Sequence, residues 1–238
     1  MENIVMEKRS AIIIGKGPSL KRVTSDYVES FDDIIICNLP RYEGYEHILP
    51  FRAAYQFRNN STPSFNNDAI KRLGLKGIFS TTKIGQKLSC DTEDSIVPIH
   101  YSKDYMPALF QKDDISMSIR YGDNKTVDPT TGIIAFSWAV NANKYSEICL
   151  VGFDMLQVGK DCYYFRPEEY QENIKYLLGK DYTLDGKRKH ESLHAPKDMI
   201  DYIYYEIVNH KNTNFSFVTD SQSLVDKIVK LENVAFIK

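Results

Sequence analysis

Short runs of mostly apolar, often β-branched residues recur along the chain and are followed by small or polar residues. The run AIII at 11–14 precedes Gly15, and the run IIIC at 34–37 precedes Asn38. The run EICLV at 147–151 precedes Gly152. Apolar runs without alternation predict strands buried on both faces, as in a parallel sheet. Weaker strands are predicted at 53–57 and 77–80, and two further strands at 215–218 and 234–237.

Segments with helical character lie between these strands. They cover residues 67–73, 131–143, 167–178, 198–209 and 223–231. Strands that alternate with helices predict an α/β fold with a mostly parallel sheet flanked by helices. We expect one domain over residues 1–238. Within it, 58–67 is predicted to be a loop, and 157–194, rich in charges and tyrosines, a lid or insertion.

Composition narrows the class of protein. Of the 238 residues, 42% are hydrophobic and 26% charged, so the chain can bury a sizeable core. The net charge is −2, whereas a nucleic-acid-binding protein would normally show an excess of basic residues. No signal peptide is visible, and no run approaches the ~20 apolar residues of a spanning helix. We expect a cytoplasmic protein. The sequence allows peripheral association with the inner membrane and leaves the oligomeric state open.

The cysteines fit the same picture. Cys37 and Cys149 lie inside strand-like runs, where a buried reduced thiol is expected, and neither they nor Cys90 and Cys162 form a CxxC pair. Neither a zinc site nor a redox pair is predicted, which suits a reducing compartment.

The first candidate site is the loop after the first strand, GKGPSL. Its glycines would let the backbone approach a phosphate, and a helix start there would offer N–H groups. A tight turn capped by a serine explains the loop equally well. It matches neither GxGxxG nor the P-loop pattern, which argues against a dinucleotide site or a P-loop kinase. The candidate residues are Gly15, Lys16, Gly17, Pro18 and Ser19.

Other polar residues also stand at the ends of predicted strands. Asn38, and Asp154 in the segment Gly152-Phe153-Asp154, would face the crevice where open α/β sheets bind ligands. The asparagine amide suits a base or a ribose, and the aspartate suits ribose hydroxyls. A turn before Pro40, or a capped turn at the aspartate, are the structural alternatives.

Two further segments precede predicted helices. Thr130 or Thr131, followed by Gly132, would cap the helix at 131–143, whose start attracts anions, although a capped helix needs no ligand. His194 stands before the helix at 198–209. Histidine is the usual general base for deprotonating a hydroxyl, but a lone histidine is more often a surface or core residue.

Taken together, these segments resemble the bacterial sialyltransferases of glycosyltransferase family 42. In that family GNGPSL follows a strand, CN ends the next, TSG opens a helix and SGID ends a later strand, with a tyrosine-bearing lid and a histidine before a helix. Here the order holds over roughly residues 10–225. The PTTG and GFD segments are also similar to the sialylmotifs of animal sialyltransferases. The matching segments are GKGPSL at 15–20, CN at 37–38, TTG at 130–132, GFD at 152–154, Tyr163, Tyr164 and His194.

The resemblance implies a GT-A-like fold and an inverting, metal-independent transfer of a sialic acid or related sugar acid from a CMP-activated donor to a glycan hydroxyl. It implies no cofactor and a place in lipopolysaccharide or capsule glycan synthesis. The 15–19 loop and 130–132 would cradle the CMP, and Asn38 and Asp154 would hold the nucleotide. His194 would deprotonate the acceptor, and Tyr163 or Tyr164 would donate to the leaving phosphate.

Three positions depart from the family pattern. Lys16 stands where the family has asparagine, and could meet the donor phosphate or face solvent. Leu156 replaces one family tyrosine, and Asp128 an arginine. These changes leave open a donor such as CMP-Kdo or another nucleotide sugar, and a non-catalytic module that binds a nucleotide or glycan. A hydrolase is less favoured, because the sequence has neither a GxSxG elbow nor a DxD pair at a strand end.

Overall fold

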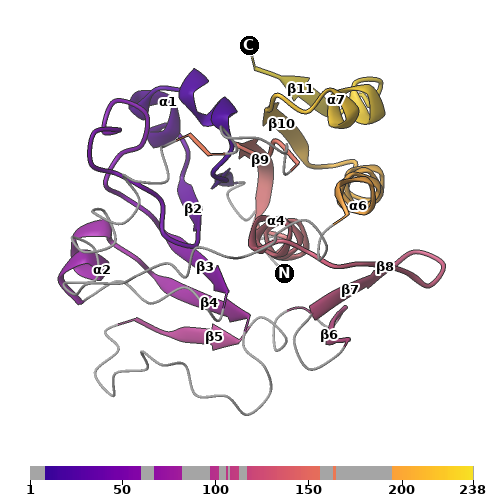
Figure 1. Cartoon of the computed structure of the whole chain (residues 1–238), viewed down its shortest axis with the longest axis horizontal. Helices are drawn as coiled ribbons and strands as arrows, with labels where there is room; N and C mark the ends of the chain where they lie inside the picture. Colours follow the sequence, from indigo (N-terminus) through magenta and orange to yellow (C-terminus); the bar gives the residue numbers. More distant parts are fainter. Residues whose placement is uncertain are drawn as a thin grey trace, which may run out of the picture.

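The computed structural model describes residues 9–59, 67–81, 97–101, 106, 108–112, 117–155, 163–164 and 195–237. Within them an eight-stranded sheet runs in the order β11-β10-β9-β1-β2-β3-β4-β5, and each strand pairs parallel with its neighbours (Figure 1). The strands are β1 (Arg9–Ile14), β2 (Asp33–Cys37), β3 (Tyr55–Asn59), β4 (Gly77–Thr81), β5 (Ile99–Tyr101), β9 (Tyr145–Val151), β10 (Asn214–Val218) and β11 (Val234–Phe236).

Helices cover both faces of this sheet (Figure 1). Alternate residues of β1 show why: Ala11 and Ile13 pack into one core cluster, and Ile12 and Ile14 into the other. The first cluster includes α4 (Thr131–Asn141), α6 (Pro196–Asn209) and α7 (Gln222–Ile228). The second includes the 3₁₀ helix η1 (Pro18–Arg22), α1 (Ser25–Glu29) and α2 (Asn67–Leu73). The predicted class, a mostly parallel sheet flanked by helices, is confirmed.

A small antiparallel sheet, which the sequence pattern did not predict, lies beside α6. It consists of β6 (Leu109–Gln111), β7 (Met117–Tyr121) and β8 (Lys125–Val127), in that order. Tyr121 on β7 packs its ring against Tyr202 and Tyr205 of α6, with centroids 5.1 and 5.2 Å apart. The small sheet leads directly into α4, so it fixes the approach to the start of that helix.

The predicted strand at 53–57 was two residues early. β3 runs over Tyr55–Asn59, and Tyr55 pairs with Ile35 and Gly77. The polar residues Arg58 and Asn59 were therefore wrongly placed in the predicted loop at 58–67; the Arg58 side chain is fully buried. The predicted helix at 167–178 lies outside the described residues. No helix among the residues described is long and apolar enough to cross a membrane.

Candidate functional site

The segments singled out in the sequence meet at one edge of the sheet. β1 lies between β9 and β2, with Ile14 in register with Val151 and with Ile36. The carboxyl ends of these three neighbouring strands therefore place the segments starting at Gly15, Gly152 and Asn38 side by side (Figure 1). This is the edge at which parallel α/β sheets bind ligands.

Glycines let two of these loops touch backbone to backbone. The Gly15 N–H donates to the Val151 carbonyl at 2.7 Å, and the Gly17 N–H donates to the Gly152 carbonyl at 2.9 Å. A Cβ on Gly15 would lie 2.4 Å from the Gly152 oxygen, and one on Gly17 would lie 2.2 Å from Asp154 Oδ2. Gly152 itself has a φ of +75°, which favours glycine.

Asp154 joins three loops through its buried carboxylate. Oδ2 accepts the Ser19 N–H at 2.9 Å, and Oδ1 accepts the Asp220 N–H at 2.7 Å. The Ser19 hydroxyl donates to the Val218 carbonyl at 2.9 Å, so it does not cap η1. The carboxylate thus organises the loops after β1, β9 and β10, whatever further role it has toward a nucleotide.

These contacts give the GKGPSL loop a structural explanation. The N–H groups of Gly15, Gly17 and Ser19 all donate within the protein. The helix that follows begins at Pro18 and is a five-residue 3₁₀ helix. The glycines are required for close packing against 151–154, so the pattern that suggested a phosphate loop is accounted for by loop-on-loop contact. A nucleotide role for these residues stays a prediction.

Asn38 adopts a left-handed backbone conformation at the end of β2, with a φ of 57°. Its N–H donates to the Phe57 carbonyl at 2.6 Å, and its side-chain oxygen accepts the Asn59 N–H at 3.1 Å. Asparagine is among the few residues that tolerate this region. The half-buried side chain thus links the ends of β2 and β3.

The start of α4 reaches the same edge. Of the two predicted caps, Thr130 is the N-cap, and its hydroxyl accepts the Ile133 N–H at 3.4 Å. Thr131 is buried in the first turn. A Cβ on Gly132 would lie 3.0 Å from the Phe153 ring, so this glycine lets the helix start pack directly on the GFD segment.

Two tyrosines of the predicted lid lie over the loop after β1. The Tyr164 N–H donates to the Lys16 carbonyl at 2.9 Å. The Tyr164 side chain is fully buried, and its hydroxyl both accepts the Arg41 N–H and donates to the Arg41 carbonyl, each at 2.6 Å. Tyr163 is 37% exposed, and the Lys16 ammonium lies 5.9 Å from its ring centroid. Of the two phenols, that of Tyr163 is the accessible one.

Asp128 is one of the departures from the family pattern. It links the segment before α4 to the small antiparallel sheet. Its carboxylate accepts hydrogen bonds from the Ser118 hydroxyl on β7 and from the Lys112 ammonium, the latter at 3.0 Å. His194 and Leu156 lie outside the described residues, as does most of the predicted lid at 157–194. Among the residues described, no cluster of His, Cys, Asp and Glu side chains could hold a metal ion.

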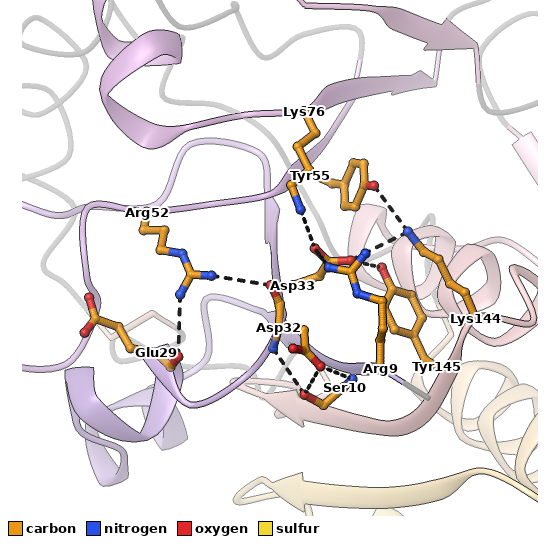
Figure 2. Close-up of polar contacts among 10 residues, drawn as sticks. All are labelled: Arg9, Ser10, Glu29, Asp32, Asp33, Arg52, Tyr55, Lys76, Lys144 and Tyr145. Carbon is orange, nitrogen blue, oxygen red and sulfur yellow. Dashed lines mark hydrogen bonds and ion pairs between the residues drawn. The ribbon is translucent and has the colours of Figure 1, made fainter. Parts of the chain in front are cut away.

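The opposite edge of the sheet holds a charged cluster that sequence reasoning missed. Asp33 is fully buried at the start of β2 (Figure 2). Its carboxylate accepts from the Tyr145 hydroxyl at 2.8 Å, from Arg9 at 2.9 Å and from the Lys76 ammonium at 3.1 Å. Burial alone would raise the pKa of Asp33, but the bonds from Tyr145 and Lys76 and the nearby lysine charges outweigh it and lower the pKa.

Lys144 also belongs to this cluster, and three aromatic rings surround its ammonium. Its ammonium lies 3.7 Å from Asp33 Oδ2 and within 4.5–4.8 Å of the ring centroids of Tyr55, Trp138 and Tyr145. Burial lowers the pKa of Lys144, and the charge of Asp33 opposes that shift. Sequence offered one signal for the cluster: charged residues stand at or just before the starts of β1, β2, β4 and β9.

Comparison with known proteins gives the fold a name. No protein-family model matches the chain, and no curated protein sequence matches it. Among solved structures, it resembles the sialyltransferase CstII from Campylobacter jejuni in complex with cytidine-5′-monophosphate, with a TM-score of 0.53, 17% identity, and coverage of 92% of this chain and 84% of that chain. A variant of the same sialyltransferase in complex with CMP gives a TM-score of 0.58, 19% identity, and coverage of 97% and 90%.

These likenesses show that the chain has the sialyltransferase fold. Because both identities are below 20%, they establish the architecture alone. Membership of glycosyltransferase family 42, and the likeness to the animal sialylmotifs, stay predictions, since no family model matches.

Proposed function

We propose that this protein is a glycosyltransferase that moves a sialic acid or a related sugar acid from a CMP-activated donor to a glycan hydroxyl. One observation carries the proposal: the residues predicted to hold the donor, far apart in sequence, meet at one edge of a fold shared with a CMP-bound sialyltransferase. Gly15, Gly17 and Gly152 lie in contact there, as do Gly132 and Phe153.

In the proposed reaction, the acceptor hydroxyl oxygen attacks the anomeric carbon from the face opposite the CMP. The bond from that carbon to the phosphate oxygen breaks, and CMP leaves with the electron pair. The acceptor proton passes to the imidazole of His194, acting as general base. Because the hydroxyl oxygen enters on the face opposite the departing CMP, the configuration at the anomeric carbon is inverted.

The leaving phosphate needs charge stabilisation as it departs. We assign its hydrogen-bond donor to Tyr163, because this phenol is accessible beside Lys16 whereas the Tyr164 hydroxyl is bonded to the Arg41 backbone. Tyr164 instead fixes the position of Tyr163 next to the loop after β1. The capped start of α4 adds a partial positive charge on the same side.

The test is release of CMP from CMP-sialic acid and CMP-Kdo in the presence of a glycan acceptor, with and without EDTA. Release from a CMP-sugar that depends on the acceptor and resists EDTA is the expected result. Release from UDP- or GDP-sugars instead would move the donor class, and no release from any donor despite nucleotide binding would favour the non-catalytic module.

A further inference from the structure

The loop that follows β10, residues 219–221, reaches the same edge of the sheet as the loops after β1 and β9. β10 pairs with β9, and Val218 is in register with Val151, so the two strands end side by side. The Gly152 N–H donates to the Val218 carbonyl at 3.2 Å. No site residue was predicted from the sequence in this loop, yet it borders the proposed nucleotide site.

The loop after β10 holds the GFD segment, residues 152–154, by two further hydrogen bonds. The Thr219 hydroxyl donates to the Phe153 carbonyl at 2.9 Å. The Asp220 N–H donates to Asp154 Oδ1 at 2.7 Å. With the backbone bond from the glycine, each residue of the GFD segment is therefore bonded to the end of β10 or to the loop that follows it.

The turn that begins with the GFD segment needs such support. Gly152 has a φ of 75°, and Met155 has a φ of 52°, so both residues are left-handed. For a residue with a side chain this conformation is unfavourable, and it persists where the surrounding structure fixes it. The buried Met155 is such a residue. Contacts from neighbouring loops thus keep this turn in its observed shape.

The position of the GFD segment sets how two other predicted donor segments meet it. The Phe153 ring packs against the start of α4, where a Cβ on Gly132 would lie 3.0 Å from the ring. On the other side, the Gly152 carbonyl accepts the Gly17 N–H at 2.9 Å. A shift of the GFD segment would therefore move it relative to both the α4 start and the loop after β1.

Thr219 contributes to this support through its side chain. The buried hydroxyl donates to the Phe153 carbonyl and accepts the Ser221 N–H at 3.0 Å, so both its donor and its acceptor functions are used. The bonds from Gly152 and Asp220 come from backbone N–H groups, which a substitution at position 219 leaves in place. The bond to Phe153 is lost when the hydroxyl is removed.

We propose that Thr219 is a positioning residue for the proposed transfer. It acts through Phe153, by fixing the GFD segment against the start of α4 in the shape that binds the nucleotide. The inference rests on the proposed function, because the site that it positions is the donor site proposed there. Without the hydroxyl the segment populates other arrangements, and a site that is competent for part of the time binds its ligand more weakly in proportion.

The experiment compares the wild type with Thr219→Val, which removes the hydroxyl at nearly constant shape, and with Thr219→Ser, which keeps it. CMP affinity is measured by calorimetry, and kcat and KM are measured for transfer from the CMP-sugar. We expect Thr219→Val to bind CMP about five- to thirtyfold more weakly, as the loss of one hydrogen bond implies. The KM for the CMP-sugar should rise with it, while kcat and the KM for the acceptor stay unchanged. Thr219→Ser should restore wild-type values.

Two control variants separate positioning from a general loss of stability. Thr213→Val is the matched control at the other end of the same strand, because the Thr213 hydroxyl donates to the Tyr145 carbonyl of β9 at 3.5 Å. Asp33→Asn removes the carboxylate that three cations share at the opposite edge of the sheet, and is expected to lower the melting temperature. Both controls should keep wild-type CMP affinity when it is measured well below the melting range.

The possible contrary results differ in what they overturn. Wild-type CMP affinity in Thr219→Val, equal weakening in Thr219→Ser, or equal weakening in Asp33→Asn would each overturn the role of the hydroxyl and leave the proposed function standing. If the wild type neither binds CMP nor releases it from a CMP-sugar, the proposed function fails and this inference with it. Should Thr219→Val not fold, Thr219→Ala, which places no methyl group against the Phe153 carbonyl, takes its place under the same criteria.

Discussion

At the amino ends of β1, β2, β4 and β9, charged side chains surround the buried Asp33, whereas at the carboxyl ends of β1 and β9 backbone meets backbone through glycines. The amino edge (Figure 2) is thus fixed by long side chains reaching one carboxylate. The carboxyl edge is fixed by glycines that bring the loops close and by the Asp154 carboxylate, which accepts backbone N–H groups instead of cations. The difference is one of construction within one sheet: the first edge gathers charges around a carboxylate, and the second brings loops, a capped helix start and Lys16 together, where we propose that the nucleotide binds.

The largest expected effect concerns chemistry alone. His194→Ala should lower the transfer rate by about 10²- to 10⁴-fold, because a positioned general base contributes that much. The melting temperature and the affinity for CMP should stay at wild-type values. Rates of transfer from the CMP-sugar, measured beside CMP binding, test this. A variant that transfers sugar at close to the wild-type rate would remove His194 from the mechanism.

The next effect tests the amino edge. Asp33→Asn should destabilise the protein by about 3 kcal/mol, because three partly exposed cations lose the carboxylate they share. For a chain of this size that lowers the melting temperature by roughly 6–12 °C. CMP affinity, measured below the melting range, should not change. Asp32→Asn is the control, since among the residues that the structure describes this exposed carboxylate accepts hydrogen bonds only from Ser10.

Acid provides a second view of the same residue. The pKa of Asp33 is lowered in the folded protein, so its ionisation stabilises the fold above the unfolded-state value of about 4. That contribution is lost as pH falls below about 4. Denaturant midpoints recorded between pH 6 and pH 2 should fall more steeply for the wild type than for Asp33→Asn. Parallel curves would show that this carboxylate does not govern the acid response.

A pair of glycines compares the two edges directly. Gly17→Ala should destabilise the protein by about 1–3 kcal/mol and weaken CMP binding, because its Cβ would lie 2.2 Å from the Asp154 carboxylate and 2.7 Å from the Gly152 carbonyl. A Cβ on Gly77, at the amino end of β4, would have its nearest neighbours in the His100 and Tyr55 side chains at 3.4–3.6 Å, which is ordinary van der Waals contact. Thermal melts of Gly77→Ala should therefore resemble the wild type. Equal losses in both variants would mean that the tight packing of the carboxyl edge is not special.

The smallest effect separates the two lid tyrosines. Tyr164→Phe should cost about 1–3 kcal/mol, because the buried Arg41 N–H loses its hydrogen-bond partner. Tyr163→Phe should stay within about 0.5 kcal/mol of the wild type in stability, since the side chain is accessible, and should slow transfer instead. Thermal melting curves and sugar-transfer rates of both variants show which tyrosine supports stability and which supports the reaction. If Tyr163→Phe transfers at the full rate, it is not the donor to the leaving phosphate.

Sequence reasoning captured the parts of the fold that have a local cause. Continuous apolar runs such as Ala11–Ile14 predicted strands covered on both sides, and Thr130 or Thr131 was predicted to cap α4. It placed β3 two residues early, because Arg58 and Asn59 are polar and their burial depends on the flanking strands β2 and β4. α1 is five residues long, too short to show a helical period.

The two edges were unequally predictable for a physical reason. Loops at the carboxyl edge carry motifs that are contiguous in sequence, such as GKGPSL. The amino edge draws Arg9, Asp33, Lys76 and Lys144 from strand starts up to 135 residues apart, so only the order of strands in the sheet reveals that one carboxylate serves three cations. Even at the carboxyl edge, the sequence could not tell that Gly17 faces Asp154, a contact between loops after different strands.

The proposed binding of a cytidine nucleotide is tested most directly by a thermal-shift panel of CMP, CDP, UMP, UDP, GDP, AMP and NAD without added metal. A ligand present at a hundred times its dissociation constant adds ~2.7 kcal/mol of stability, which for a chain of this size raises the melting temperature by roughly 5–10 °C. We expect such a rise with the cytidine nucleotides. A rise with AMP or NAD and none with CMP or CDP would contradict it.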